Sequence, residues 1–93
     1  MEATTSPIDL VQTLAEPTRL RIMNCLAAAP LFVSDLQEVL ALPQSTVSRH
    51  LQVLRRAALV RDTPVTPFVI YRLRHPEGAT GRLLQALLEA VGM

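Results

Sequence analysis

The sequence predicts a mainly α-helical domain with one small β-hairpin. Apolar residues recur at helical spacing over most of the chain, and two β-prone runs flank a proline-rich tip within residues 60–73. The 93 residues suffice for one small domain and leave no room for a second core. We therefore expect residues 1–93 to form a single domain of about five helices and a two-stranded hairpin.

Local start and stop signals define the first three helices. Ser6, followed by proline, is typical of a capped helix start. Pro17 interrupts that helix and starts a second one, which we expect over residues 17–28. Residues 34–37 have the S-x-x-Q form of a capping box, which predicts a third, short helix ending near Leu40.

The fourth predicted helix, residues 44–57, has two chemically different sides. Its apolar positions fall within about 60° of one another at helical periodicity. They are Val47, Leu51, Leu54 and Ala58. The opposite side carries serine, glutamine and arginine and no acid. These side chains can bond base edges and phosphates, so we call residues 44–57 the reading helix.

The rest of the chain completes a recognisable order of elements. Residues 60–73 predict a hairpin around a tip at 64–67, and residues 77–92 carry a broad apolar stripe that predicts a last helix. A short helix, a three-residue turn and the reading helix together have helix-turn-helix geometry. Because the hairpin follows directly, the fold class is a winged helix-turn-helix.

The net charge of +1 conceals an uneven distribution. All nine basic residues are arginines, and six of them lie within residues 49–74 beside a single acid, Asp62, which gives that segment a charge of +5. The remainder holds three arginines and seven acids, a charge of −4. This asymmetry indicates a polyanionic partner, although a solvated basic face is the alternative.

Composition argues against several classes of function. The single cysteine, Cys25, cannot build a disulfide framework or a cysteine-based zinc site within one chain. No apolar run reaches the roughly 18 residues of a membrane span, so we expect no membrane association and a cytoplasmic location. We expect neither an enzyme nor a cofactor, because the sequence offers no nucleophile–base pair and residues 78–81 are too short for a phosphate loop.

Two motifs resemble the ArsR/SmtB family of bacterial transcriptional regulators. They are LAEPTRLRI at residues 14–22 and QSTVSRHL at residues 44–51, and residues 53–60 and 71–73 are also similar. The resemblance implies a homodimeric winged-helix repressor that binds double-stranded operator DNA. Since a twofold dimer places two reading helices in successive major grooves, the expected operator is an imperfect palindrome.

The resemblance and the side-chain chemistry agree on candidate DNA contacts in the reading helix and the wing. In the reading helix the candidates are Gln44, Ser45, Thr46, Ser48, Arg49, His50, Gln52, Arg55 and Arg56. In the wing they are Arg61 and Arg72, with Arg74 at its exit. Arg55, Arg56 and the wing arginines are expected at phosphates rather than bases. His50 lies at the side of the polar face, where packing is the alternative role.

The resemblance also implies that the first and last helices form the subunit interface. The candidate interface residues are Ile8, Val11, Leu14, Leu83, Leu84, Leu87, Leu88 and Val91. The alternative is that part of this apolar set covers the core of its own chain. A small core of this size favours burial against a partner chain.

Departures from the family concern its sensing sites. The family's Cys-x-Cys metal site falls on residues 32–34, which contain no thiolate. A second family metal site falls on His75, Glu77 and two apolar positions, so only half of its ligands are present. The last helix has no cysteine for thiol sensing, and Cys25 lies one residue beyond the matching position. We expect no metal site, and the sequence leaves any small-molecule effector unknown.

Two alternative functions remain open. A metal- or thiol-responsive repressor of the same family is one alternative, and a winged-helix module that binds another protein is a second.

The family commonly has glycine after the reading helix, where this chain has Ala58. If that position is left-handed, alanine costs roughly 1 kcal/mol relative to glycine.

Overall fold

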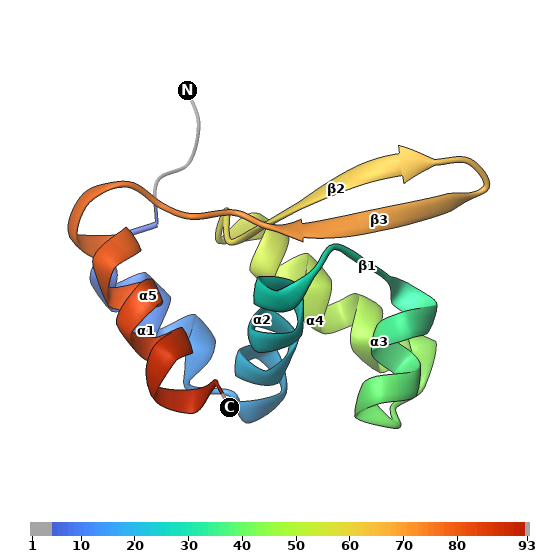
Figure 1. The fold of residues 1–93 in the computed structure, drawn as a ribbon, viewed down its shortest axis with the longest axis horizontal. Coiled ribbons are helices and arrows are strands. Elements are labelled where there is room, and N and C mark those ends of the chain that lie inside the picture. The colour runs from blue at the N-terminus through green and yellow to red at the C-terminus, as the bar shows by residue number, and fades with distance from the viewer. Residues whose placement is uncertain (1–4, 93) are drawn as a thin grey trace.

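The computed structural model describes residues 5–92, which form five helices and a three-stranded antiparallel sheet (Figure 1). The elements in chain order are α1 (Pro7–Leu14), α2 (Pro17–Ala28), β1 (Leu31–Phe32), α3 (Val33–Leu40), α4 (Gln44–Arg56), β2 (Val60–Val65), β3 (Phe68–Leu73) and α5 (Gly78–Val91). The predicted winged helix-turn-helix is confirmed. The reading helix is α4, and the hairpin β2–β3 is the wing.

The first two helices begin at side-chain caps. The Ser6 hydroxyl accepts a hydrogen bond from the backbone N–H of Asp9 at 3.1 Å, which confirms the expected cap of α1. At the start of α2, the Glu16 carboxylate accepts from the backbone N–H groups of Thr18 and Arg19 at 3.0 and 3.3 Å. Both caps satisfy N–H groups that have no partner within the helix.

The prediction that a capping box at Ser34 starts the third helix is wrong. Helix α3 begins at Val33, with Phe32 as the N-cap residue, and the Asp35 carboxylate accepts from the backbone N–H of Phe32 at 2.9 Å. The start lies earlier because Leu31 and Phe32 pair with β3, which holds the chain extended up to the first helical residue.

The sheet has the strand order β1-β3-β2, and its smallest strand was not predicted. Leu31 lies opposite Tyr71, and Phe32 lies opposite Ile70. A two-residue strand is too short to show alternation in a sequence, so only the pairing with β3 reveals it.

The tip of the wing is shorter than the predicted residues 64–67. Pro64 and Val65 belong to β2 and pair with Val69 and Phe68, which leaves a two-residue turn. Proline is compatible with this position because β2 is an edge strand of the sheet.

Every helix contributes apolar side chains to one core. Helices α1 and α5 lie side by side, α2 lies between this pair and α4, and the wing extends above α4 and α3 (Figure 1). The fully buried large side chains are Leu10, Ile22, Met23, Leu36, Val47, Leu51, Leu54, Leu59 and Leu84. None of the helices within residues 5–92 has the length and apolar content that crossing a bilayer requires.

The glycines of residues 78–81 have structural explanations. Gly78 has a φ of 65°, a left-handed conformation that favours glycine. A side chain on Gly81 would overlap the backbone carbonyl of Pro76, so α5 approaches the preceding loop as only glycine allows. This segment forms the first turn of α5.

Candidate nucleic-acid interface

A left-handed residue forms the turn of the helix-turn-helix. Ala41, at the C-terminal end of α3, has a φ of 56°. Pro43 is the N-cap residue of α4, and its carbonyl accepts from the N–H groups of Thr46 and Val47 at 3.1 Å each. The expected connection over residues 41–43 is thus confirmed as the turn that sets α4 against α3.

Packing of its apolar side determines which side of α4 is exposed. Val47, Leu51 and Leu54 are completely buried, so the opposite side of the helix faces solvent. The exposed candidates are Gln44, Ser45, Arg49, Gln52, Arg55 and Arg56, whereas Thr46 and Ser48 are half-buried. We call this acid-free set of exposed and half-buried side chains the α4 polar face.

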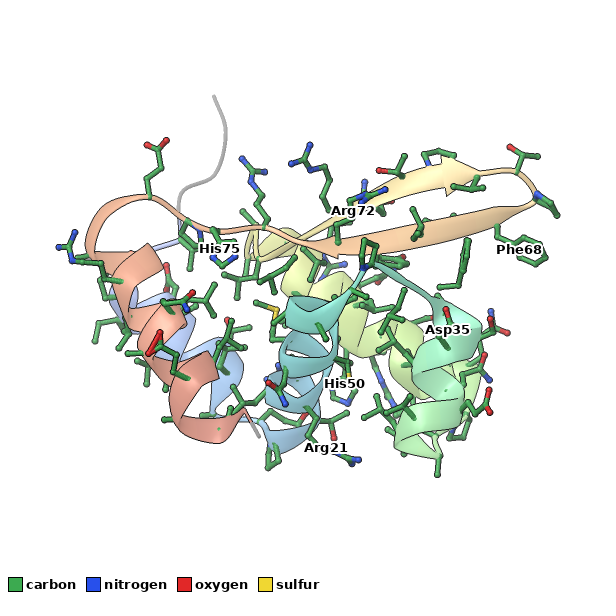
Figure 2. The ribbon with its side chains drawn as sticks, viewed as in Figure 1. Arg21, Asp35, His50, Phe68, Arg72 and His75 are labelled. Carbon is green, nitrogen blue, oxygen red and sulfur yellow. The ribbon has the colours of Figure 1, made fainter. Side chains whose placement is uncertain are left out.

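His50 differs from the other candidates because its side chain is only 16 % exposed. Its Nδ1 atom lies 3.4 Å from Oε2 of Glu16 and 3.4 Å from Nη1 of Arg19. Figure 2 shows His50 beside α2, away from Arg72 on the wing. The ring therefore faces the start of α2 rather than the α4 polar face.

Glu16 and Arg19 were not recognised as candidates, although both lie in the quoted motif of residues 14–22. A hydrogen bond from the Thr18 N–H holds the pKa of Glu16 below its ordinary value, and burial acts in the opposite direction. The hydrogen bond from the Arg19 N–H and the charges of His50 and Arg19 lower this pKa further. Glu16 is therefore an anionic acceptor at neutral pH. Capping residues and motif membership were the signals available in the sequence.

A sharp turn after α4 places the wing next to it. Ala58 has a φ of 60°, so the left-handed conformation considered for this position is confirmed. The Leu59 N–H donates to the carbonyl of Leu54 at 2.9 Å, and the Arg74 N–H donates to the carbonyl of Leu59 at 2.9 Å. These bonds join the end of α4 to both ends of the hairpin.

The wing places two arginines directly opposite each other. Arg61 on β2 pairs in register with Arg72 on β3, and both side chains are exposed. Figure 2 shows Arg72 on the wing. Like charges at opposed positions destabilise a strand pair unless an anion lies between them. This pair is therefore an electrostatically unfavourable feature that a phosphate would relieve.

The only acid of the basic segment is engaged in an ion pair. Asp62 Oδ1 lies 3.1 Å from Nε of Arg55, which links the end of α4 to β2. Asp62 also lies opposite Tyr71 in the hairpin. Burial raises the pKa of Tyr71, the negative charge of Asp62 raises it further, and the positive charge of Arg55 lowers it. The ion pair between Asp62 and Arg55 therefore connects the wing to the last turn of α4.

The structure divides the predicted interface residues into two groups. Leu14, Leu84 and Leu88 are 4 %, 0 % and 7 % exposed, so their assignment to a subunit interface is corrected: they form part of the core of their own chain. The others remain accessible on the two adjacent helices. Ile8, Val11 and Val91 are exposed and Leu83 and Leu87 are half-buried, and we call these five residues the α1–α5 apolar face.

The positions that correspond to family sensing sites are dispersed. Phe32 occupies the start of α3, His75 and Glu77 lie in the loop before α5, and Cys25 is half-buried against the core. Within residues 5–92, no group of three or more histidine, cysteine, aspartate or glutamate side chains is arranged to hold a metal ion.

An exposed polar reading helix, a basic wing beside it and a helical scaffold define a winged helix-turn-helix protein of the nucleic-acid-binding class. Residues 14–63 match the family model described as a helix-turn-helix domain. The chain belongs to the ArsR/SmtB family, which comprises transcriptional regulators and not enzymes.

Related proteins of known name support this assignment. The chain is 41 % identical to the transcriptional regulator NmtR of Mycobacterium tuberculosis over 63 residues, which is 68 % of this chain and 52 % of NmtR. It is 34 % identical to the transcriptional repressor SmtB of the same species over 83 residues, covering 89 % of this chain and 58 % of SmtB. The chain thus spans little more than half the length of these relatives.

Solved structures show the same fold. Reduced HlyU from Vibrio cholerae superposes with a TM-score of 0.76 at 30 % identity, covering 90 % of this chain and 86 % of HlyU. The transcriptional repressor BigR from Xylella fastidiosa superposes with a TM-score of 0.77 at 28 % identity, covering 90 % of this chain and 81 % of BigR.

Proposed function

We propose that this chain is a sequence-specific DNA-binding transcriptional repressor that acts as a homodimer. The observation that carries the proposal is the continuity of the acid-free α4 polar face with the opposed arginines of the wing. Several relatives bear the name of repressor, among them PagR of Bacillus anthracis, which supports this direction of regulation. A regulator of this kind works in the cytoplasm, where bacterial DNA is.

The α4 polar face has the chemistry that a major-groove contact needs. Gln44, Ser45 and Gln52 can donate and accept hydrogen bonds at base edges, and Arg49 can bond both acceptors of guanine at once. Thr46 and Ser48 can reach phosphates or bases at the edges of the face. Arg55 and Arg56 lie in the last turn of α4, where we assign them to the sugar-phosphate backbone.

The wing adds contacts that favour DNA without reading its sequence. Arg61 and Arg72 repel each other across β2 and β3, and a phosphate oxygen between them would convert this repulsion into two charge-assisted bonds. Binding to phosphates releases counterions, so the affinity should fall steeply as salt rises.

The α1–α5 apolar face supports the homodimer. Ile8 and Val11 are 67 % and 48 % exposed, and Val91 at the end of α5 is 39 % exposed. Burying these side chains against a second copy removes apolar surface from water and brings two reading helices into one particle. Two such helices one DNA turn apart would read the two halves of a palindrome.

Fluorescence anisotropy with a labelled duplex from the DNA upstream of its own coding sequence tests the proposal. We expect saturable binding that competes poorly with unrelated duplex and weakens steeply between low and physiological salt. Equal affinity for both duplexes would contradict sequence-specific recognition. Absence of binding to either duplex would favour a winged-helix module whose basic face serves another protein.

The same titration in the presence of zinc, nickel, arsenite or an oxidant tests regulation. We infer that sensing in this chain does not use the metal sites of the family, because Phe32 and Leu88 occupy ligand positions. Release of DNA at micromolar zinc would contradict this inference.

A further inference from the structure

A cluster of three polar side chains joins three helices beneath the α4 polar face. Arg19, on α2, donates from Nε to the carbonyl of Thr13 in α1 at 2.7 Å. Glu16 is held at the start of α2 by the two backbone N–H groups that it caps. His50 reaches this pair from α4. The cluster therefore connects the reading helix with α1, which carries part of the α1–α5 apolar face.

We propose that His50 is a positioning residue, which through Glu16 and Arg19 sets the orientation of the reading helix relative to α1 and α2. The inference rests on the proposed function, since orientation matters only if the α4 polar face meets DNA. It assigns His50 a role inside the protein, which develops the packing alternative raised by its place at the side of the polar face.

The hydrogen-bonding chemistry of imidazole gives His50 a partner in either state of its ring. When Nδ1 carries a lone pair it accepts from Nη1 of Arg19, and when the ring is protonated Nδ1 lies within ion-pair distance of Oε2 of Glu16. Each partner lies 3.4 Å away. Because the ring is largely buried, a loss of both partners would leave a polar atom without compensation.

The remaining contacts of α4 do not fix its rotation as strictly. Val47, Leu51 and Leu54 hold the helix by apolar burial, which is non-directional. Hydrogen bonds are directional, and a bond from mid-helix to the rigid start of α2 restricts both rotation and tilt. Arg49 precedes His50 in the chain, and productive contacts tolerate displacements of only about 0.5 Å.

Three variants separate positioning from direct contact. His50→Phe keeps a ring of similar shape and removes the ring nitrogens. His50→Asn restores a polar atom at the place of Nδ1. Glu16→Ser keeps an effective N-cap for α2, because serine caps well, but it is too short to reach His50.

A double-mutant cycle on operator affinity is the test, with the upstream duplex as probe. We expect His50→Phe and Glu16→Ser each to weaken binding by up to roughly tenfold. The double variant should bind no more than about tenfold more weakly than wild type, because without the ring nitrogens of His50 the Glu16 carboxylate has no effect left to exert on α4. His50→Asn should recover most of the affinity that His50→Phe loses.

Independent effects would overturn the inference. If His50 contacted DNA directly, its removal would cost the same with or without Glu16, and the double variant would bind roughly a hundredfold more weakly. Wild-type affinity in His50→Phe would overturn it as well. Melting temperatures of all variants identify any loss of binding that is due to unfolding.

A matched control uses the second histidine. His75→Phe makes the same change at an exposed position in the loop before α5, and its operator affinity should equal that of wild type. If wild-type protein does not bind the duplex, the proposed function fails and the inference fails with it. If wild-type protein binds and the cycle is additive, only the inference fails.

Discussion

Arg49 lies on the exposed side of α4, and its neighbours on the buried side anchor the helix without it. The core contacts of α4 come from Val47, Leu51 and Leu54, none of which touches solvent. Shortening an exposed side chain on the opposite side therefore removes the proposed binding group and should leave the fold unchanged. Binding and folding can be tested separately at this position.

Arg49→Ala should weaken operator binding by roughly 1–3 kcal/mol, the range for one specific base contact. Anisotropy titrations measure the loss, and the thermal unfolding midpoint should not change. Arg82→Ala removes the same charge from an exposed position on α5 and serves as the control. Equal losses in both variants would show that Arg49 acts only through general charge.

Ala58 adopts a conformation that glycine adopts more easily. Its φ of 60° brings Cβ close to the backbone, and Ala58→Gly should raise the free energy of unfolding by roughly 0.5–1 kcal/mol. Denaturant titration measures the change. Ala57, with a φ of −79°, provides the opposite control, because Ala57→Gly should lower stability by a similar amount. Destabilisation by Ala58→Gly would contradict the assigned backbone conformation.

At the scale of elements, α1 and α5 each bury one side in the core of the chain and leave apolar side chains accessible on the other side. Leu10 and Leu84 face the core of the chain, while Ile8 and Val11 remain in solvent on α1. An amphipathic helix normally exposes polar residues on its outer side. The exposed aliphatic side chains therefore favour a protein partner, and a second copy is the partner that we propose.

Ile8→Glu should convert the proposed dimer into a folded monomer. The residue is 67 % exposed, so a carboxylate there is compatible with the folded chain and unfavourable in an apolar interface. Light scattering gives the mass, and circular dichroism checks the helix content. Val39→Glu, at a 58 % exposed position on α3, is the control and should leave the mass unchanged. A dimer of Ile8→Glu would place the interface elsewhere.

At the scale of the whole molecule, folding brings the arginines of residues 49–74 together on two adjoining elements. The basic segment becomes α4 and the wing, and Asp62 within it is bound to Arg55. A net charge of +1 therefore coexists with a strongly positive surface. Such a distribution predicts weak long-range attraction to DNA overall and strong contacts at one face.

The salt dependence of DNA binding measures how many of these arginines meet phosphates. Arg61→Gln and Arg72→Gln should each reduce the slope of log affinity against log salt by about 1, and weaken binding to operator and unrelated duplex alike. The neutral Gln52→Ala variant on α4 should leave the slope unchanged. An unaltered slope in both arginine variants would show that Arg61 and Arg72 do not contact phosphates.

Much of the fold and of the candidate site was predictable from local patterns. The cap at Ser6, the apolar repeat of the reading helix and the break at Pro17 follow from interactions within a few residues. The exposed position of Arg49 follows from the same repeat, because the apolar side of a helix must be buried. Short-range periodicity therefore determined the order of the five helices and the hairpin, and the polar face of the reading helix.

Tertiary structure alone decided features that depend on residues distant in sequence. The strand at Leu31 exists only through Tyr71, and Leu84 belongs to the core rather than an interface because α1 and α2 cover it. The helical pattern placed His50 at the side of the polar face, but Glu16 lies 34 positions away in the chain, so no local pattern could show which residues its ring meets. The sequence by itself determined which side chains have the hydrogen-bonding chemistry and charge that a DNA contact needs, and packing decided how far each of them is exposed, since burial depends on the whole set of neighbours.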